Sequence, residues 1–456
     1  MKAEAGDLAA TPTRRSFAEA TIDLFERIIP DPFVLAVLIT ILVAALSALF
    51  APKASFEHIV LGWYKGFFDI LTFGFQIILV LVTGHAFAHA PPVQRVFKSI
   101  VGVARTPVQA ATLTFLLVAI ASFFNWGLGL VVSALLAREV AKRMPVDFAW
   151  IVAAGFSGWV VQAGGISSTI VLAQATHGSP MNVVEKLTGH VLPFTETVFT
   201  PFNLIPAAVM LVATPIVIAL MRPRDADAIV LDIAKNPDPT PPARPATMSF
   251  AKRLEYSRVA SLLLGVAGVA VVVFTQILNI GTFSGVNAVI FVMFILGLVL
   301  HGYPLAYGNA VKNAARQAGS MTLQYPLYGG VMGIMAATGL PGVIANFFIA
   351  ISTTHTLPFW SYVCSLLVTF LVPSGGGHWA VQGPFVIPAA VALHSSTAAT
   401  SMAVAVGEQV SNMMQPFWAA PVVAMAGVGV QRVLGFTMMT FLLGAVVYGV
   451  AFLFLV

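Results

Sequence analysis

The chain has 456 residues, of which 58% are hydrophobic and 9% are charged, with a net charge of +5. Soluble domains carry about a quarter charged residues, so this composition excludes a water-soluble enzyme. The mean hydropathy is +0.91, and apolar stretches of about 20 residues, the length that crosses a bilayer as a helix, recur along the chain. They are continuous rather than alternating, which excludes a transmembrane β-barrel. The sequence therefore predicts an all-α polytopic membrane protein.

Apolar windows predict about nine transmembrane helices. The polar N-terminal segment lacks the pattern of a cleaved leader, so we expect the first helix to be retained. Two further apolar regions, about 107–142 and 357–393, are too short for two spans and a turn, and each is interrupted near its middle. We interpret them as re-entrant hairpins. The nine windows are 32–50, 70–90, 149–177, 198–221, 257–279, 286–301, 321–340, 397–425 and 433–455.

The positive charges indicate the topology, because short cytoplasmic loops collect Lys and Arg. With a cytoplasmic N-terminus, all but three of the 23 Lys and Arg residues lie on the cytoplasmic side, the exceptions being Lys53, Lys65 and Lys186. These charges lie in loops and not on one basic face, so we expect a protein of the bacterial inner membrane and no nucleic-acid partner. Arginines flank the first hairpin, whereas residues 317–407 around the second carry no charge. The two hairpins are therefore expected to enter from opposite faces.

Opposite entry is what an inverted repeat predicts. An offset of about 250 residues carries the region of Gln162 onto that of Gln415, and the features around each hairpin keep the same order in both halves. A charged, Pro-rich stretch between the halves is typical of a connector. The expected organisation is an N-terminal repeat (1–221), a cytoplasmic linker (222–256) and a C-terminal inverted repeat (257–456).

Four stretches interrupt the apolar pattern at membrane depth: "FFNWGLGL" from Phe123, "GFSGWVVQAGGISSTI" from Gly155, "VPSGGGHWAVQGP" from Val372 and "GEQVSNMMQPFW" from Gly407. Unwound backbone is tolerated in a membrane only where protein or a water-filled cavity satisfies it, and the helix ends at such breaks bind ions. Each half thus offers a hairpin tip and a broken helix, about 149–177 and 397–425. The candidate substrate-binding residues are Asn125, Trp126, Gly127, Gly164, Gly165, Ser167, Ser168, Ser374, Gly375, Gly376, Gly377, His378, Asn412 and Gln415.

These four stretches contain no Lys or Arg, which favours a singly charged anion held by amides and hydroxyls over a phosphate or a dianion. The three glycines after Ser374 precede a run that can form a helix, so this tip is a candidate amide nest for a carboxylate. The alternative is close helix packing, since Gly and Ser are frequent at transmembrane helix contacts. The pairing of the breaks across two halves favours the site.

Glu408 is the only acid between residue 257 and the C-terminus. An ionisable group inside a membrane is costly and is a functional candidate by default. It is expected to carry a coupling proton or, with Ser411 and Asn412, to bind sodium; the alternative is an interfacial carboxylate. A sodium site near Asn125 and Ser374 is a further candidate. No cofactor and no cysteine-based metal site are expected, because Cys364 is the only cysteine.

At these residues the sequence resembles the short-chain fatty acid transporter family, the acetoacetate and butyrate permease type. The matching phrases include "NWGLGLVVSALLAREVAKR" from Asn125, "VPSGGGHWAVQGPFVIPAA" from Val372 and "GEQVSNMMQPFWAAP" from Gly407. The resemblance extends to a wider group of carriers with two opposed hairpins. It implies a short-chain monocarboxylate substrate, a scaffold with a moving transport domain, elevator-like alternation and a homodimer. The sodium ligands of the dicarboxylate carriers cannot be assigned to positions of this sequence. Where those carriers have Ser-Asn-Thr motifs, this chain has "NWG", "GGISS", "SGGG" and "VSNMM".

The resulting hypothesis is cation-coupled secondary transport of a short-chain fatty acid anion. A carrier for a dicarboxylate or another small organic anion, or a passive anion channel, is the alternative. An intramembrane enzyme is disfavoured, because the sequence offers no nucleophile, base and orienting acid on neighbouring helices.

Overall fold

The computed structural model describes residues 32–224, 228–231, 248–278, 285–319, 321–370, 372, 374–415, 418–419 and 429–456. Every regular element in these ranges is a helix. The N-terminal segment, the middle of the predicted linker and residues 416–417 and 420–425 of the predicted helix 397–425 lie outside them. The all-helical prediction is confirmed.

Six helical segments are long and apolar enough to cross a membrane, and the pair α16 (Met321–Thr338) and α17 (Leu340–Ile351), bent by 81°, would add a seventh. Of the nine predicted spans, 32–50 and 286–301 correspond to shorter apolar helices, and 321–340 falls in this bent pair. The first arm of the predicted hairpin 107–142 is itself long enough to span the membrane. The chain is thus a polytopic membrane protein. The six segments are Leu71–Ala88 (α4), Pro107–Phe124 (α6), Phe148–Ala175 (α8, η1 and α9), Pro201–Leu220 (α11), Phe250–Ile277 (α12, α13 and η3) and Val430–Phe454 (α22).

The remaining helices have 6 to 19 residues, and the sequence does not predict several of them. Their apolar runs are interrupted by charges or by Gly and Pro, as in α5 and α15, so windows of about 20 residues overlook them. They are α2 (Pro32–Phe50), α3 (Phe56–Asp69), α5 (Pro91–Val101), α7 (Trp126–Ala141), α10 (Val183–Thr188), α14 (Gly285–His301), α15 (Pro304–Gln317), α18 (Leu357–Val368), α19 (Gly375–Ala392) and α20 (Thr397–Asn412).

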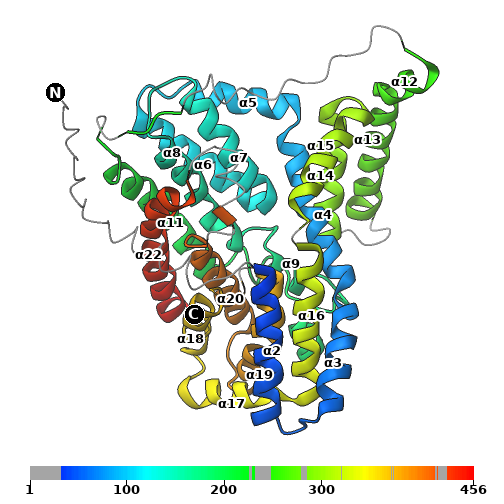
Figure 1. The fold of residues 1–456 in the computed structure, drawn as a ribbon, viewed down its shortest axis with the longest axis vertical. Helices are drawn as coiled ribbons and strands as arrows, with labels where there is room; N and C mark the ends of the chain where they lie inside the picture. The colour runs from blue at the N-terminus through cyan, green and yellow to red at the C-terminus, as the bar shows by residue number, and fades with distance from the viewer. Residues whose placement is uncertain are drawn as a thin grey trace, which may run out of the picture.

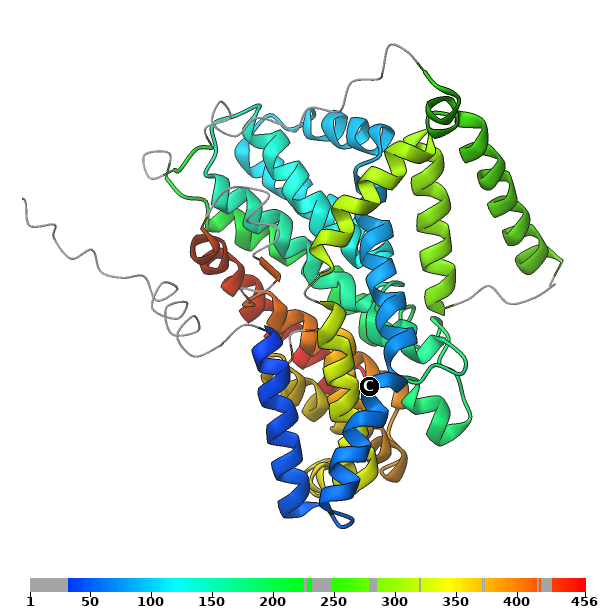
Figure 2. The ribbon, with the colours of Figure 1, turned by 45° about the vertical axis from the view of Figure 1, so that its right-hand side comes forward.

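Helices α2, α3 and α16 lie side by side and form one wall of the molecule (Figure 1). Four glycines bring α3 and α16 into backbone contact: Gly62 and Gly66 face Gly329 and Gly333. Without hydrophobic driving force in lipid, such close approach and its van der Waals contacts hold helices together. On the opposite side, α13 and α14 form an outlying pair attached to α4 (Figure 2).

We expect Gly333→Ala to destabilise this wall. A Cβ at this position would overlap the carbonyl oxygen of Gly62, and overpacking of a well-packed contact costs about 1–3 kcal/mol. The thermal midpoint of the purified protein should fall by several degrees. The matched control is Gly308→Ala on α15, where a Cβ meets open space and alanine is the better helix former. Equal midpoints for the two variants would contradict the prediction.

The two predicted hairpins are α6–α7 and α18–α19, and they lie toward opposite ends of the molecule (Figure 1). The first turns at Asn125 and the second between Val368 and Gly375. Their tips meet near the middle of the bundle. The opposed arrangement agrees with the charge map, while the inverted repeat and the domain boundaries drawn from it stay predictions.

The first broken helix consists of α8 (Phe148–Gly158), the 3₁₀-helix η1 (Trp159–Gly164), an unwound stretch and α9 (Thr169–Ala175). Its middle packs on α20 of the second half. There the Gln162 side-chain amide donates to the Gln409 side-chain oxygen at 2.5 Å, and Gln409 donates to the Trp159 carbonyl at 3.1 Å. Two polar side chains thus join the broken helices at the centre of an apolar bundle.

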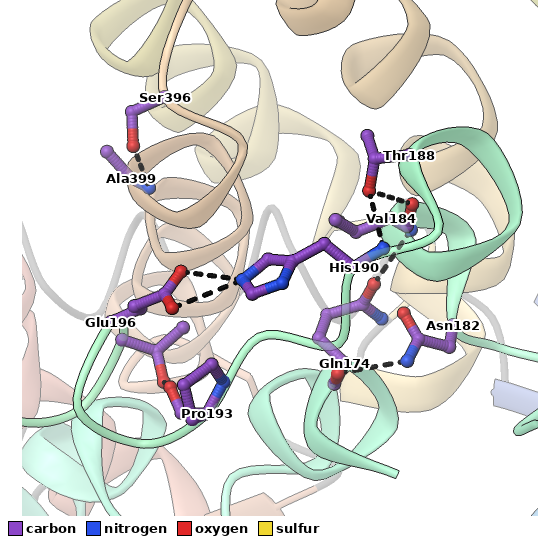
Figure 3. Close-up of polar contacts among 10 residues, drawn as sticks. Gln174, Asn182, Val184, Thr188, His190, Pro193, Glu196, Ser396 and Ala399 are labelled. Carbon is purple, nitrogen blue, oxygen red and sulfur yellow. Dashed lines mark hydrogen bonds and ion pairs between the residues drawn. The ribbon is translucent and has the colours of Figure 1, made fainter. Parts of the chain in front are cut away.

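The segment that follows α9 is held by side-chain hydrogen bonds (Figure 3). The Gln174 side-chain oxygen accepts from the Val184 N–H, and the Asn182 amide donates to the Gln174 carbonyl. The His190 ring lies 3.0–3.1 Å from both carboxylate oxygens of Glu196. The Trp379 indole N–H adds a bond to the Met181 carbonyl, so this segment is fixed to the second hairpin.

The part of the linker around Ile229 is bonded to the start of α8. Asp147 caps α8 by accepting from the Trp150 N–H, and its other oxygen accepts from the Ile229 N–H. Ile229 in turn accepts from the Phe148 N–H at 2.9 Å. Arg432 at the start of α22 forms an ion pair with the same carboxylate. One buried aspartate therefore ties linker, α8 and α22 together.

Candidate substrate site

A small polar cavity lies where the hairpin tips meet the broken helices. Its residues come from both halves of the chain, which brings segments about 250 residues apart in sequence into one site. Several are buried polar side chains in an otherwise apolar core. The lining residues are Trp126, Trp159, Gln162, Ser168, Thr169, Ile170, Tyr325, Ser374, Gly375, Ala405, Glu408, Asn412 and Trp418.

The tip of the first hairpin is set by Asn125. Its side-chain oxygen caps α7 by accepting from the Leu128 N–H at 2.8 Å, and its amide donates to the Val80 carbonyl of α4 at 3.3 Å. Asn and Asp are strong N-cap residues because they satisfy an otherwise unpaired amide. Asn125 is fully buried and does not itself line the cavity. It orients the next residue, Trp126, which does.

The unwound stretch of the first broken helix is bonded to this tip. The Trp126 N–H donates to the Ser167 hydroxyl at 2.8 Å, and the Ile166 N–H donates to the Phe123 carbonyl at 3.0 Å. Gly165 packs against the backbone of Phe123, where a Cβ would not fit. Ser168 reaches the cavity, whereas the Gly164 carbonyl accepts from Asn203 at 2.9 Å.

Three indole rings form the aromatic side of the cavity. Trp418 lies 5.8 Å from Trp126 and 5.1 Å from Trp159, centroid to centroid. The Trp159 indole N–H donates to the Trp126 carbonyl at 2.9 Å. The Trp126 indole N–H, by contrast, is buried and has no hydrogen-bond partner among the described residues. An unpaired buried donor beside a cavity is costly unless a ligand or water satisfies it.

Glu408 provides the only formal charge of the cavity. The side chain is 3% exposed, and one carboxylate oxygen accepts from the Asn412 amide at 2.6 Å. No ion pair to Glu408 occurs within the described ranges, and its nearest charged neighbours in sequence are Arg316 and Arg432. The Asn412 side-chain oxygen has no donor among the described residues. An isolated carboxylate here requires a proton or a cation, because an ionised group buried without a countercharge is strongly unfavourable.

The second hairpin tip contributes Ser374 and Gly375 to the cavity. Ser374 lies near Tyr325 of α16 at the cavity and leaves the N-terminus of α19 without a side-chain cap. The first amides of an uncapped helix are free to bind an anion. A Cβ at Gly376 would meet Tyr325, and one at Gly377 would meet Tyr328. These two glycines therefore bring α19 against α16.

Three other predicted residues point away from the cavity. His378 is fully buried and its ring bonds with Ser365 at 3.0 Å and Gln382 at 2.6 Å. The Ser411 hydroxyl donates to the Leu366 carbonyl, and the Gln415 amide donates to the Thr369 carbonyl. All three fasten α19 or α20 to α18, and Gly127 similarly packs on Leu81 of α4. Their predicted roles in substrate or ion binding stay predictions.

The structure also adds lining residues that sequence reasoning missed. Tyr325 comes from a helix with no polar break, and its only local signal is the following Pro326 inside the apolar run. Thr169 and Trp159 lie inside the quoted stretch 155–170 but were not selected, and Gln162 was noted only for its place in the repeat. Positions that face a cavity through tertiary packing carry no local signature.

The cavity has a volume of about 20 Å³, which is room for about one water molecule. A four-carbon acid with six heavy atoms does not fit. Binding such a ligand therefore requires the hairpin tips and broken helices to separate.

Opposed helical hairpins, a broken helix and a buried polar site near mid-bundle are features of polytopic membrane transporters. The sequence matches the short chain fatty acid transporter family over residues 14–455. The chain belongs to this family.

Relatives agree with this assignment, and two solved structures share the fold. The chain is 36% identical over 425 residues to an Escherichia coli K12 protein described as a candidate short-chain fatty acid transporter, covering 92% of this chain and 95% of the relative. A Haemophilus influenzae protein of the same description is 35% identical over 435 residues, covering 94% and 96%. The fold is similar to the YdaH transporter of Alcanivorax borkumensis, with a TM-score of 0.60, 14% identity and 93% and 98% of the two chains covered. It is also similar to MtrF of Neisseria gonorrhoeae, described among antimetabolite efflux pumps, with a TM-score of 0.58, 14% identity and 95% and 97% covered.

Proposed function

We propose that this protein carries a short-chain fatty acid anion, of the butyrate or acetoacetate type, across the bacterial inner membrane together with a proton or a sodium ion. The observation that carries the proposal is the cavity around Glu408, with unpaired polar atoms on Trp126 and Asn412. Family membership supports the substrate class. The N-terminus is cytoplasmic and the carrier is a homodimer in this proposal.

The donors around the cavity match one carboxylate. The Trp126 indole N–H and the uncapped amides at the start of α19 supply hydrogen bonds, and no Lys or Arg lines the site. A dianion would lack a countercharge here. The indole rings of Trp126, Trp159 and Trp418 are apolar surfaces for a short aliphatic tail. A monocarboxylate therefore fits better than a dicarboxylate.

Coupling in this proposal rests on Glu408. A proton or sodium ion bound at its carboxylate neutralises the site, and a carboxylate substrate then binds without facing a second negative charge. Asn412 and Ser374 offer oxygen atoms near the same place, and oxygen ligands suit either cation. The loaded site crosses the membrane at lower cost than a site with two uncompensated charges.

Movement in this proposal takes place where the hairpin tips contact two helices of the scaffold. On one side Gly84 and Gly127 allow α4 and α7 to approach closely; on the other, Gly376 and Gly377 lie on the rings of Tyr325 and Tyr328. At these four positions glycine presents no side chain that a sliding surface would have to pass. These contacts favour an elevator-like displacement of the hairpins against α4 and α16.

Uptake of labelled butyrate into proteoliposomes tests the proposal. We expect saturable uptake that a sodium gradient or an inward proton gradient drives above equilibrium, with counterflow against preloaded butyrate. No saturable uptake under any gradient would sink the proposal. Unsaturable flux without counterflow would instead indicate a channel, and strong competition by succinate would indicate a dicarboxylate carrier.

A further inference from the structure

A groove outside the central site runs along the start of α6. It is lined by the loop between α5 and α6 and by successive turns of α6, and it has a volume of about 540 Å³. Val103 at its edge is 71% exposed. The guanidinium of Arg105 is exposed as well. The lining residues are Val103, Ala104, Arg105, Val108, Gln109, Thr112 and Leu113.

The surroundings of the groove are strongly cationic. Residues 91–146 contain six Lys and Arg residues and one acid, Glu139. Glu139 is already paired, with Lys142 at 2.7 Å and Lys98 at 3.9 Å. Arg143 donates to the Lys98 carbonyl at 2.8 Å and so lies beside the same loop. Cations therefore outnumber acids along this stretch, even when Asp147, the next residue of the chain, is counted with Glu139.

Arg105 is the cation that belongs to the groove itself. Its backbone N–H donates to the Gln109 side chain at 2.9 Å, but its guanidinium forms no ion pair with any described residue. Helix α5, which ends beside it, lies across the ends of the bundle helices (Figure 1). That orientation, with Arg95 and Lys98 on α5 and apolar Val96 and Phe97 between them, is typical of a helix at the membrane interface.

We propose that this groove binds an anionic phospholipid, with its phosphate at Arg105 and one acyl chain along Val108, Thr112 and Leu113. Basic pockets beside transmembrane helices at the interface bind anionic head groups. The apolar lining residues favour a lipid over a free phosphate, because a soluble anion would leave Val103 and Leu113 in contact with water. A zwitterionic lipid carries its own positive charge and gains less from the guanidinium of Arg105 than an anionic lipid does. The bound lipid stabilises α6, one arm of the hairpin whose tip borders the central cavity.

The purified full-length protein, exchanged into neutral detergent, tests this proposal. Retained lipid is counted by native mass spectrometry, and the thermal midpoint is measured with phosphatidylglycerol, with phosphatidylcholine and with inorganic phosphate. Arg105→Gln is compared with Arg253→Gln, an exposed cation on α12 away from the groove. Thr112→Trp, which fills the groove without changing charge, is compared with Ile120→Trp on the exposed face of α6.

We expect phosphatidylglycerol to be retained and to raise the midpoint more than the other two additives. Arg105→Gln should lower its retention about fivefold, the effect of one interfacial arginine on an anionic lipid, and Thr112→Trp should also lower it. Both control variants should retain lipid as the wild type does. Equal retention by the Arg105 and Arg253 variants, equal effects of the two lipids, or equal protection by inorganic phosphate would overturn the proposal.

Discussion

Replacing Glu408 by glutamine should abolish gradient-driven accumulation of butyrate while leaving exchange across the membrane. Glutamine keeps the size of the side chain and can keep the hydrogen bond that the Asn412 amide donates to Glu408 at 2.6 Å in the wild type. It binds neither a proton nor a cation. Without coupling, accumulation should fall at least about tenfold, toward the equilibrium distribution, because an intramembrane carboxylate is the default coupling group. Proteoliposomes with labelled butyrate measure both accumulation under a gradient and counterflow without one.

The matched control for this experiment is Glu57→Gln. Glu57 lies in the first turn of α3, is exposed and is far along the chain from the site. The Glu57→Gln variant should accumulate butyrate as the wild type does. Wild-type accumulation by the Glu408 variant would remove Glu408 from the coupling mechanism. Loss of counterflow together with accumulation, in a variant that still folds, would place Glu408 in substrate binding instead.

Replacing Trp126 by phenylalanine should weaken substrate binding. Phenylalanine keeps an aromatic ring beside Trp418, whose ring centroid lies 5.8 Å from that of Trp126 in the wild type. It removes the indole N–H that has no partner among the described residues. A hydrogen bond to a carboxylate contributes about 1.5–3 kcal/mol. The KM for butyrate should therefore rise about tenfold or more, with a smaller change in maximal rate, in initial-rate measurements over a range of butyrate concentrations.

Trp360→Phe is the matched control, since Trp360 is 38% exposed on α18 and does not line the cavity. Its KM should equal that of the wild type. An unchanged KM in the Trp126 variant would show that the indole donor does not contact the substrate. A fall in maximal rate at constant KM would assign Trp126 to the conformational step.

Much of the site could be predicted from local signals. Polar residues close to glycines inside an apolar run mark a helix break, and this is the signal at Asn125, Ser168 and Ser374. Glu408 was identified because no other acid follows residue 257. These signals are local because a break must satisfy its own backbone groups, so the residues that do this lie within a few positions of it.

Other parts of the site depend on which helices become neighbours. His378 and Gly376 lie in the same stretch as Ser374, yet the first bonds to Ser365 of α18 and the second packs on Tyr325 of α16. A helix turns its side chains about 100° per residue, so adjacent residues face different partners. The sequence of α19 contains no information about what those partners are. The predicted binding roles of His378 and Gly376 therefore rest only on their closeness to Ser374 in the sequence.

By itself, the sequence determined that this protein is a helical membrane protein, predicted its two opposed hairpins and singled out Glu408 as an isolated acid. Only the tertiary structure decided which of the break residues share a cavity, that Tyr325 and Trp159 join them, and that the cavity has a volume of only about 20 Å³. The reason is physical. Membrane insertion and helix breaking depend on hydropathy and backbone hydrogen bonding over a few turns, whereas a binding cavity is the space left when side chains from distant segments pack together.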